Sequence, residues 1–366
     1  MRSQYRNASP GKHCRGTNSL QRLLHNFVDT RPEIVELNLA LQGGGAHGAF
    51  TWGVLDRLLE DERVEISAVS GASAGALNAI ALVDGFAAGG RAGARAKLEA
   101  VWHAVMSKVQ WGPFAKLPDY SAMFAFDVAT RIFAPAQLNP FAVNPLREVL
   151  LSHIDFRRVR RSAGMGLYIA ATDVATGEAR IFGRHEMSAK AVLASACLPQ
   201  LMPAVRIGGR AYWDGGFSSN PPLWPLIDRR GAEEILAVLL SPRIEPSVPA
   251  TAQEIGARLS WLAFGQPLAR ELAAIECART TGTLGGLFRR RLRRQRLSFI
   301  EAGSAVAGLG RATRLVPERH LVQCLKEAGR RAADAWLAQR LGERRGRRRP
   351  PRRSSERSSS VGRRAA

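Results

Sequence analysis

The stretch EISAVSGASAGALNAIA, from Glu65 to Ala81, places one serine between two alanines and two glycines. Residues 66–70 form an apolar run of strand length, and the residues from Ala74 onward have the spacing of a buried helix. A serine on the sharp turn between a strand and a helix is typical of a nucleophile elbow, G-x-S-x-G. A packing turn of small residues is the alternative. The flanking elements favour the elbow, with Ser73 as nucleophile within Gly71, Ala72, Ser73, Ala74 and Gly75.

A similar unit comes one strand earlier in the chain. A predicted strand at 37–41 runs into Gly43, Gly44, Gly45, Ala46, His47 and Gly48, and a helix follows from Ala49. A dinucleotide-binding turn would need an acidic residue at the end of the next strand, where Ser70 and Gly71 stand instead. We therefore expect the amides of residues 43–48 to hold an oxyanion. Two consecutive strand–turn–helix units predict a parallel sheet covered by helices.

A serine hydroxyl needs a base, and Asp214 is the best candidate in the sequence. It follows the apolar pair Tyr212-Trp213 and precedes Gly215 and Gly216. Apolar surroundings would raise the pKa of Asp214 and make it a stronger base. From this motif alone, an ordinary Asp-Gly turn is an equal alternative. The histidines after Ser73 have no glycine-rich setting and are weaker candidates: His103, His153, His185 and His320.

Taken together, the three turns resemble the patatin-like phospholipase family. GGGAHG (43–48), GASAG (71–75) and DGG (214–216) occur in the family's order, and the turns ASACLP (194–199) and NPP (220–222) match it as well. The resemblance spans Leu37 to Asp228. It departs from the family at His47, where Arg or Lys is common, so we expect no role for a fixed positive charge there.

The resemblance implies a fold, a mechanism and a substrate class. The expected fold is α/β: a three-layer α/β/α sandwich with a mainly parallel central sheet, plus a helical C-terminal region. The implied mechanism is a Ser73–Asp214 dyad with an acyl-enzyme, with no metal or cofactor. The implied substrate is an acyl ester of a phospholipid or another glycerolipid. The aromatic-rich segment 102–141 is interpreted either as a lining for the acyl chain or as core.

Four segments are expected along the chain. They are an N-terminal extension (1–36), the catalytic domain (37–228), a mainly helical region (229–342) and a disordered tail rich in Arg and Ser (343–366). No apolar segment follows the basic N-terminus as in a signal peptide, and no run of about 18 apolar residues predicts a membrane span. We therefore predict a cytoplasmic protein. Its four scattered cysteines are expected to be free thiols.

The net charge of +22 comes largely from arginine runs at 289–296 and 343–366. These runs lack interleaved aromatics, and the chain has no RRM, KH or zinc pattern, so a nucleic-acid partner is not expected. Two interpretations remain for the runs: peripheral contact with an anionic membrane, or a solvated tail. The alternative to a hydrolase is a basic lipid- or nucleic-acid-binding protein with a silent site.

Overall fold

The computed structural model describes residues 34–108, 134–138, 143–228, 232, 234–280, 292–309 and 311–348. An eight-stranded sheet forms the centre of this part of the chain. Its strands are β1 (Val35–Leu41), β2 (Val64–Gly71), β3 (Gly166–Asp173), β4 (Ala179–Gly183), β5 (Val205–Ile207), β6 (Arg210–Asp214), β7 (Glu234–Leu239) and β8 (Arg296–Glu301).

The sheet is mainly parallel, as expected. Its order is β5-β6-β3-β2-β1-β7-β8, with β4 also paired to β3. The pairs along β3-β2-β1-β7-β8 are parallel, whereas β4, β6 and β5 form antiparallel pairs at one side. Strands β1 and β7 are buried almost throughout, which is typical of parallel strands covered on both faces.

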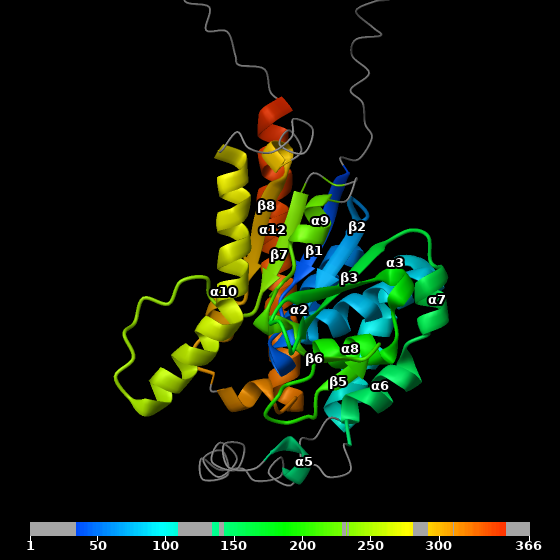
Figure 1. Ribbon diagram of the computed structural model, residues 1–366. Coiled ribbons are helices and arrows are strands. Elements are labelled where there is room, and N and C mark those ends of the chain that lie inside the picture. The colour runs from blue at the N-terminus through cyan, green and yellow to red at the C-terminus, as the bar shows by residue number, and fades with distance from the viewer. Residues whose placement is uncertain are drawn as a thin grey trace, which may run out of the picture.

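Helices surround the sheet (Figure 1). The α-helices are α2 (Gly48–Glu60), α3 (Ala74–Lys108, interrupted at Gly89–Gly90), α5 (Pro135–Leu138), α6 (Pro145–His153), α7 (Phe156–Arg161), α8 (Ala189–Ser195), α9 (Trp224–Asp228), α10 (Ala252–Thr280) and α12 (Arg319–Arg348). The short 3-10 helices are η1 (Gly45–His47), η3 (Arg184–Glu186), η4 (Gly215–Phe217), η5 (Gly303–Ala305) and η6 (Arg311–Arg314).

Two hydrophobic clusters form the layers on either side of the sheet. Alternate residues of β1 enter different clusters: Leu39 belongs to the cluster that includes residues of α2, α3, α8 and α12, and Ala40 belongs to the one that includes residues of α9 and α10. This alternation is the period-two pattern of a strand buried on both faces. The expected three-layer α/β/α sandwich is thereby confirmed.

The C-terminal part of the chain differs from the sequence-based expectation in two places. Residues 296–301, expected within a helical pattern, form β8 and extend the sheet beside β7. Helix α12 continues to Arg348, so residues 343–348 of the predicted disordered tail are helical. The remaining tail, 349–366, and residues 1–33 of the predicted extension lie outside the described residues. The predicted boundary at 228/229 stays a prediction, although β7 and β8 complete the same sheet.

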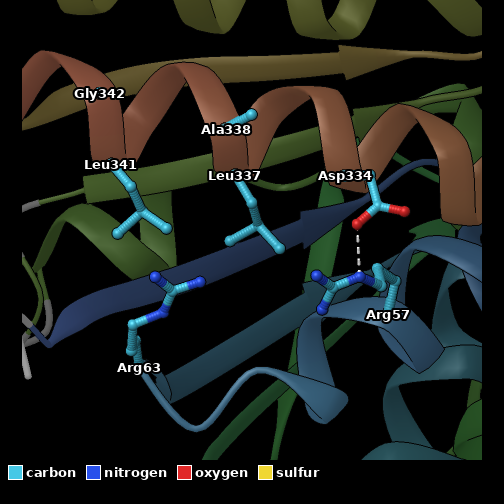
Figure 2. Close-up of a pocket in the computed structure, with 7 residues that line it drawn as sticks. All are labelled: Arg57, Arg63, Asp334, Leu337, Ala338, Leu341 and Gly342. Carbon is cyan, nitrogen blue, oxygen red and sulfur yellow. Dashed lines mark hydrogen bonds and ion pairs between the residues drawn. The ribbon is translucent and has the colours of Figure 1, made fainter.

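A hollow of about 350 Å³ lies beneath α12 (Figure 2). Its lining includes Arg57, which pairs with Asp334 at 2.5 Å, and Arg63, which immediately precedes β2. The hollow therefore lies near the beginning of β2, whereas Ser73 follows its end. In the part of the chain that the structure describes, no helix has the length and apolar character needed to cross a membrane.

Candidate active site

Ser73 occupies a strained turn between β2 and α3. Its φ angle is 54°, and among the described residues it is the only one other than glycine with a positive φ. A side chain in this left-handed region costs on the order of 1–3 kcal/mol and usually marks a functional turn. Helix α3 begins at the next residue, so the positive end of its dipole lies beside the serine. This is the backbone geometry of a nucleophile elbow.

The glycines of the elbow are required by close packing rather than by their own backbone angles. A Cβ on Gly75 would lie 2.0 Å from the carbonyl oxygen of Leu41, and a Cβ on Gly71 would lie 2.5 Å from the backbone of Gly75. Neither glycine has a positive φ. Gly71 therefore lets the turn close on itself, Gly75 lets it press against the end of β1, and the strain falls on Ser73.

Strand pairing explains why Asp214 lies near the elbow. On β3, Ile169 pairs with Gly71 of β2, and Ala171, two residues further along, pairs with Asp214 of β6. Strand β4 pairs with residues 168–172 of β3 and so occupies one edge of that strand. Strands β2 and β6 therefore both lie along the opposite edge of β3, one after the other. At about 3.3 Å per residue, Asp214 follows the end of β2 by ~7 Å. It therefore lies where the elbow begins.

The carboxyl of Asp214 is fully buried. Burial raises its pKa to about 6, opposed by the nearby Ser73 hydroxyl and by the Gly216 amide. The amide of Gly216 donates to Oδ1 at 2.8 Å, while Oδ2 is buried with no hydrogen-bond partner. Ser73 is thus close enough to influence the pKa without a hydrogen bond of normal geometry to Oδ2. Catalytic hydrogen bonds are often long before substrate binds.

The backbone around Asp214 is held by three contacts. Its amide donates to the carbonyl of Cys197 at 2.8 Å, and its carbonyl accepts from the Thr172 hydroxyl at 2.7 Å. A Cβ on Gly215 would lie 2.1 Å from the carbonyl oxygen of Ala170, so the residue after Asp214 must be glycine. These contacts hold the carboxyl against β3, which favours a built site over an ordinary Asp-Gly turn.

The glycine-rich loop lies against the elbow, and its amides divide into two groups. The Gly43 amide donates to Asn220 Oδ1 at 2.7 Å, and the amides of His47 and Gly48 bond to carbonyls within the turn. Among the described residues, no acceptor bonds to the amides of Gly44, Gly45 and Ala46, nor to that of Ala74 in the elbow. Of the six residues predicted to hold an oxyanion, 43–48, three therefore have amides available to a bound anion. The amide of Ala74, in the elbow, is a fourth.

His47 is a buried, neutral side chain. Its Nε2 lies 2.8 Å from the Thr313 hydroxyl, and Nδ1 has no partner among the described residues. Burial, followed by the charge of Arg314, lowers its pKa to about 4. With its pKa lowered in this way, the His47 side chain is uncharged at neutral pH.

Two further residues hold the site together, and neither had been assigned a role from the sequence. Ser195 is buried, and its Oγ accepts from the Ser73 amide at 2.9 Å. Asn220 accepts from the Gly43 amide and donates from Nδ2 to the Phe264 carbonyl at 3.0 Å. Ser195 is the last residue of α8 and Asn220 precedes Pro221, and both belong to motifs that carry the family resemblance, ASACLP and NPP. The resemblance was therefore the available signal. Their partners are distant in sequence, so the specific contacts had no local signal.

The remaining candidates lie elsewhere. No hydrogen bond in the described part of the chain joins a histidine to Ser73 or Asp214. Trp102, in the aromatic-rich segment, is core: it is buried, stacks on Trp52 and donates to Asn78 at 2.9 Å. Residues 109–133 and 139–141 of that segment lie outside the described residues. Within the described residues, no three His, Cys, Asp or Glu side chains form a group suited to a metal.

The fold and the site define an α/β protein with a serine elbow, a glycine-rich loop at the preceding strand end and a buried aspartate beside them. The model of the patatin-like phospholipase family matches residues 39–227, more than half of the chain. The chain therefore belongs to the patatin-like phospholipase family.

Three solved structures show a more distant similarity. VipD from Legionella pneumophila is 17% identical, with a TM-score of 0.36 over 81% of this chain and 67% of its own. The type III effector ExoU is 16% identical, with a TM-score of 0.33 over 84% of this chain and 54% of its own. The heterodimeric ExoU–SpcU complex from Pseudomonas aeruginosa is 16% identical, with a TM-score of 0.27 over 86% of this chain and 61% of its own. No curated protein matches the chain.

Proposed function

We propose that the chain is a serine lipid acyl hydrolase that cleaves carboxylic esters of phospholipids or other acyl glycerolipids through Ser73 and Asp214. The observation that carries this proposal is the strained Ser73 turn with the buried carboxyl of Asp214 beside it. Membership of the patatin-like phospholipase family supports a lipid ester as substrate.

In the first half-reaction, the Asp214 carboxylate accepts the proton of the Ser73 hydroxyl while Oγ attacks the ester carbonyl carbon. The oxyanion that forms is stabilised by free amides, for which Gly44, Gly45, Ala46 and Ala74 are the candidates. Each such donor contributes about 3 kcal/mol in other serine hydrolases. The carbon–oxygen bond to the alcohol then breaks, and the alcohol leaves with the proton from Asp214.

In the second half-reaction, water hydrolyses the acyl-enzyme. Asp214 accepts a proton from the water as its oxygen attacks the acyl carbon, and the Ser73 oxygen leaves and recovers that proton. The raised pKa of Asp214 suits both steps, because a carboxylate that binds a proton more tightly is a stronger base. A neutral His47 leaves the backbone amides as the groups that stabilise the oxyanion in this loop.

The test is fatty-acid release from a panel of diacyl phospholipids, monoacyl phospholipids and neutral glycerolipids, comparing the wild-type chain with Ser73→Ala. We expect release by the wild type from at least one class, and loss of that release in the variant. Ser152→Ala, which removes an exposed hydroxyl from α6, is the matched control and should keep wild-type activity. Equal release by Ser73→Ala would contradict the proposal.

A further inference from the structure

The first half of α10 carries an exposed apolar stripe. Ile255, Leu259 and Leu262 are 46%, 62% and 36% exposed. Figure 1 shows this half of α10 projecting away from the sheet and the helices around it. A surface helix normally turns polar residues to solvent, so three large apolar side chains in a row on the outer face indicate a contact surface.

The stripe faces away from the rest of the molecule. At about 100° per residue, Ile255, Leu259 and Leu262 lie within about 60° of one another around the helix axis. Phe264, in the same half of the helix and about 180° around the axis from Ile255, lies on the opposite side and packs on Phe217. This half of α10 therefore has two apolar faces, of which one packs on the segment that follows Asp214 and the other is exposed.

The loop before α10 extends the same surface. Ile244 and Val248 are 79% and 88% exposed. The loop is tied to the helix because Trp261 Nε1 donates to the Pro242 carbonyl at 2.9 Å and Arg258 donates to the Ser247 hydroxyl at 3.2 Å. Five of the eleven exposed large apolar residues in the described chain belong to this unit, so apolar exposure is concentrated here. We call Ile244, Val248, Ile255, Leu259 and Leu262 the α10 surface.

The same helix is fastened to the candidate active site. Phe264 packs on Phe217, two residues after Gly215, with ring centroids 4.5 Å apart. Glu271 accepts from the Leu223 amide at 2.8 Å and also bonds the Ser219 hydroxyl. The loop after Asp214 is thus held by α10 itself. The α10 surface therefore lies on the same helix that holds the segment after the proposed base.

We propose that the α10 surface docks into the apolar layer of a phospholipid bilayer, the aggregate that presents the substrate. The choice of a bilayer as partner rests on the proposed function, because a lipid hydrolase must meet its substrate where lipid is packed. Residues 241–265 contain two arginines and two glutamates, so this unit has no net formal charge. Its contact with lipid is therefore apolar, in contrast to the attraction expected of the arginine runs.

The charge balance makes the surface separable from the arginine runs. Binding is measured by co-sedimentation with phosphatidylcholine vesicles in about 0.5 M salt. At this ionic strength the Debye length is roughly 4 Å, so attraction between exposed charges is largely screened. We expect the full chain to bind, and the variant Ile255→Ser/Leu259→Ser/Leu262→Ser to bind at least about tenfold more weakly. Leu151→Ser, which removes a side chain 52% exposed on α6, is the matched control and should bind like the wild type.

Equal binding by the triple variant and the wild type, or no binding by the wild type, would overturn the proposal. A second copy of the chain is the competing occupant of the α10 surface. Light scattering tests it: a wild-type dimer that becomes a monomer in the triple variant, with unchanged vesicle binding, would also overturn the proposal. Thermal unfolding of the triple variant and of the single variant Leu259→Ser is the control for folding. A loss of binding is attributed to the α10 surface only in a variant that unfolds at the wild-type temperature.

Failure of docking and failure of the proposed function give different results. Vesicle binding does not need turnover, so Ser73→Ala should sediment with vesicles like the wild type. If the wild type binds through the α10 surface but releases no fatty acid from any lipid, docking stands and the hydrolase proposal fails. If fatty acid is released while the triple variant binds vesicles normally, the hydrolase proposal stands and docking fails.

Discussion

The two halves of the candidate site are built in different ways. Ser73 takes its strained backbone from a local turn, in which Gly71 packs on Gly75 and Gly75 packs on the end of β1. Asp214 lies in unstrained backbone at φ −48°, and its position depends on the pairing of β6 with β3, some forty residues earlier. The position of the serine thus depends on a turn, whereas the position of the aspartate depends on strand pairing in the sheet.

This difference separates local from long-range causes. A turn of five residues can be recognised in any sequence, whereas the register that carries Asp214 past the end of β2 requires the whole antiparallel side of the sheet. The chemistry differs in the same way. The strained backbone of Ser73 follows from its turn, but the raised pKa of Asp214 follows from burial by distant residues.

The largest expected effect comes from removing either reacting group. Asp214→Asn keeps the shape of the side chain and its bond from Gly216 but removes the base, so we expect hydrolysis of a soluble short-chain ester to fall by about 10³-fold or more. Labelling by a fluorophosphonate, read as an intact mass, should occur at Ser73 in the wild type and be much slower in Asp214→Asn. If Asp214→Asn is labelled and hydrolyses the ester at the wild-type rate, Asp214 is not the base that activates Ser73.

The next largest effect is expected from the glycines beside the two reacting groups, Gly75 near Ser73 and Gly215 next to Asp214. Gly75→Ala and Gly215→Ala each place a Cβ within about 2 Å of a backbone carbonyl, at 2.0 and 2.1 Å. We expect each to lower the free energy of unfolding by about 2–3 kcal/mol, measured by urea denaturation. Gly164→Ala is the control, because a Cβ there meets nothing within 4 Å. Wild-type stability in either site variant would show that the close approaches are not tight.

The smallest expected effect concerns pH and tests the aspartate side alone. The base acts only when deprotonated, so with a pKa of about 6 for Asp214, kcat/KM should be level above pH 7 and fall below pH 6. Below that point the fall approaches about tenfold per pH unit, measured with a soluble ester while fluorescence monitors the fold. A profile that stays level down to pH 5 would mean that burial does not raise the pKa of this carboxyl.

The sequence alone predicted much of the fold and the members of the candidate site. The elbow, the glycine-rich loop and the strands around them follow from residue spacing, because a strand–turn–helix unit has a local pattern. β8 was missed, since its short run lies among arginines and helical segments. The contacts of Ser195, Asn220 and Glu271 were missed because their partners lie 48 to 177 residues away.

By itself, the sequence determined that Ser73 stands on a turn between a strand and a helix, because glycine, alanine and serine at that spacing allow a sharp reversal. It also determined the order of the three motifs. Only the tertiary structure decided that Asp214 lies beside that turn and is buried, and that Asn220 occupies the Gly43 amide. Local backbone sterics act over a few residues, whereas strand register and desolvation arise only when distant segments pack together.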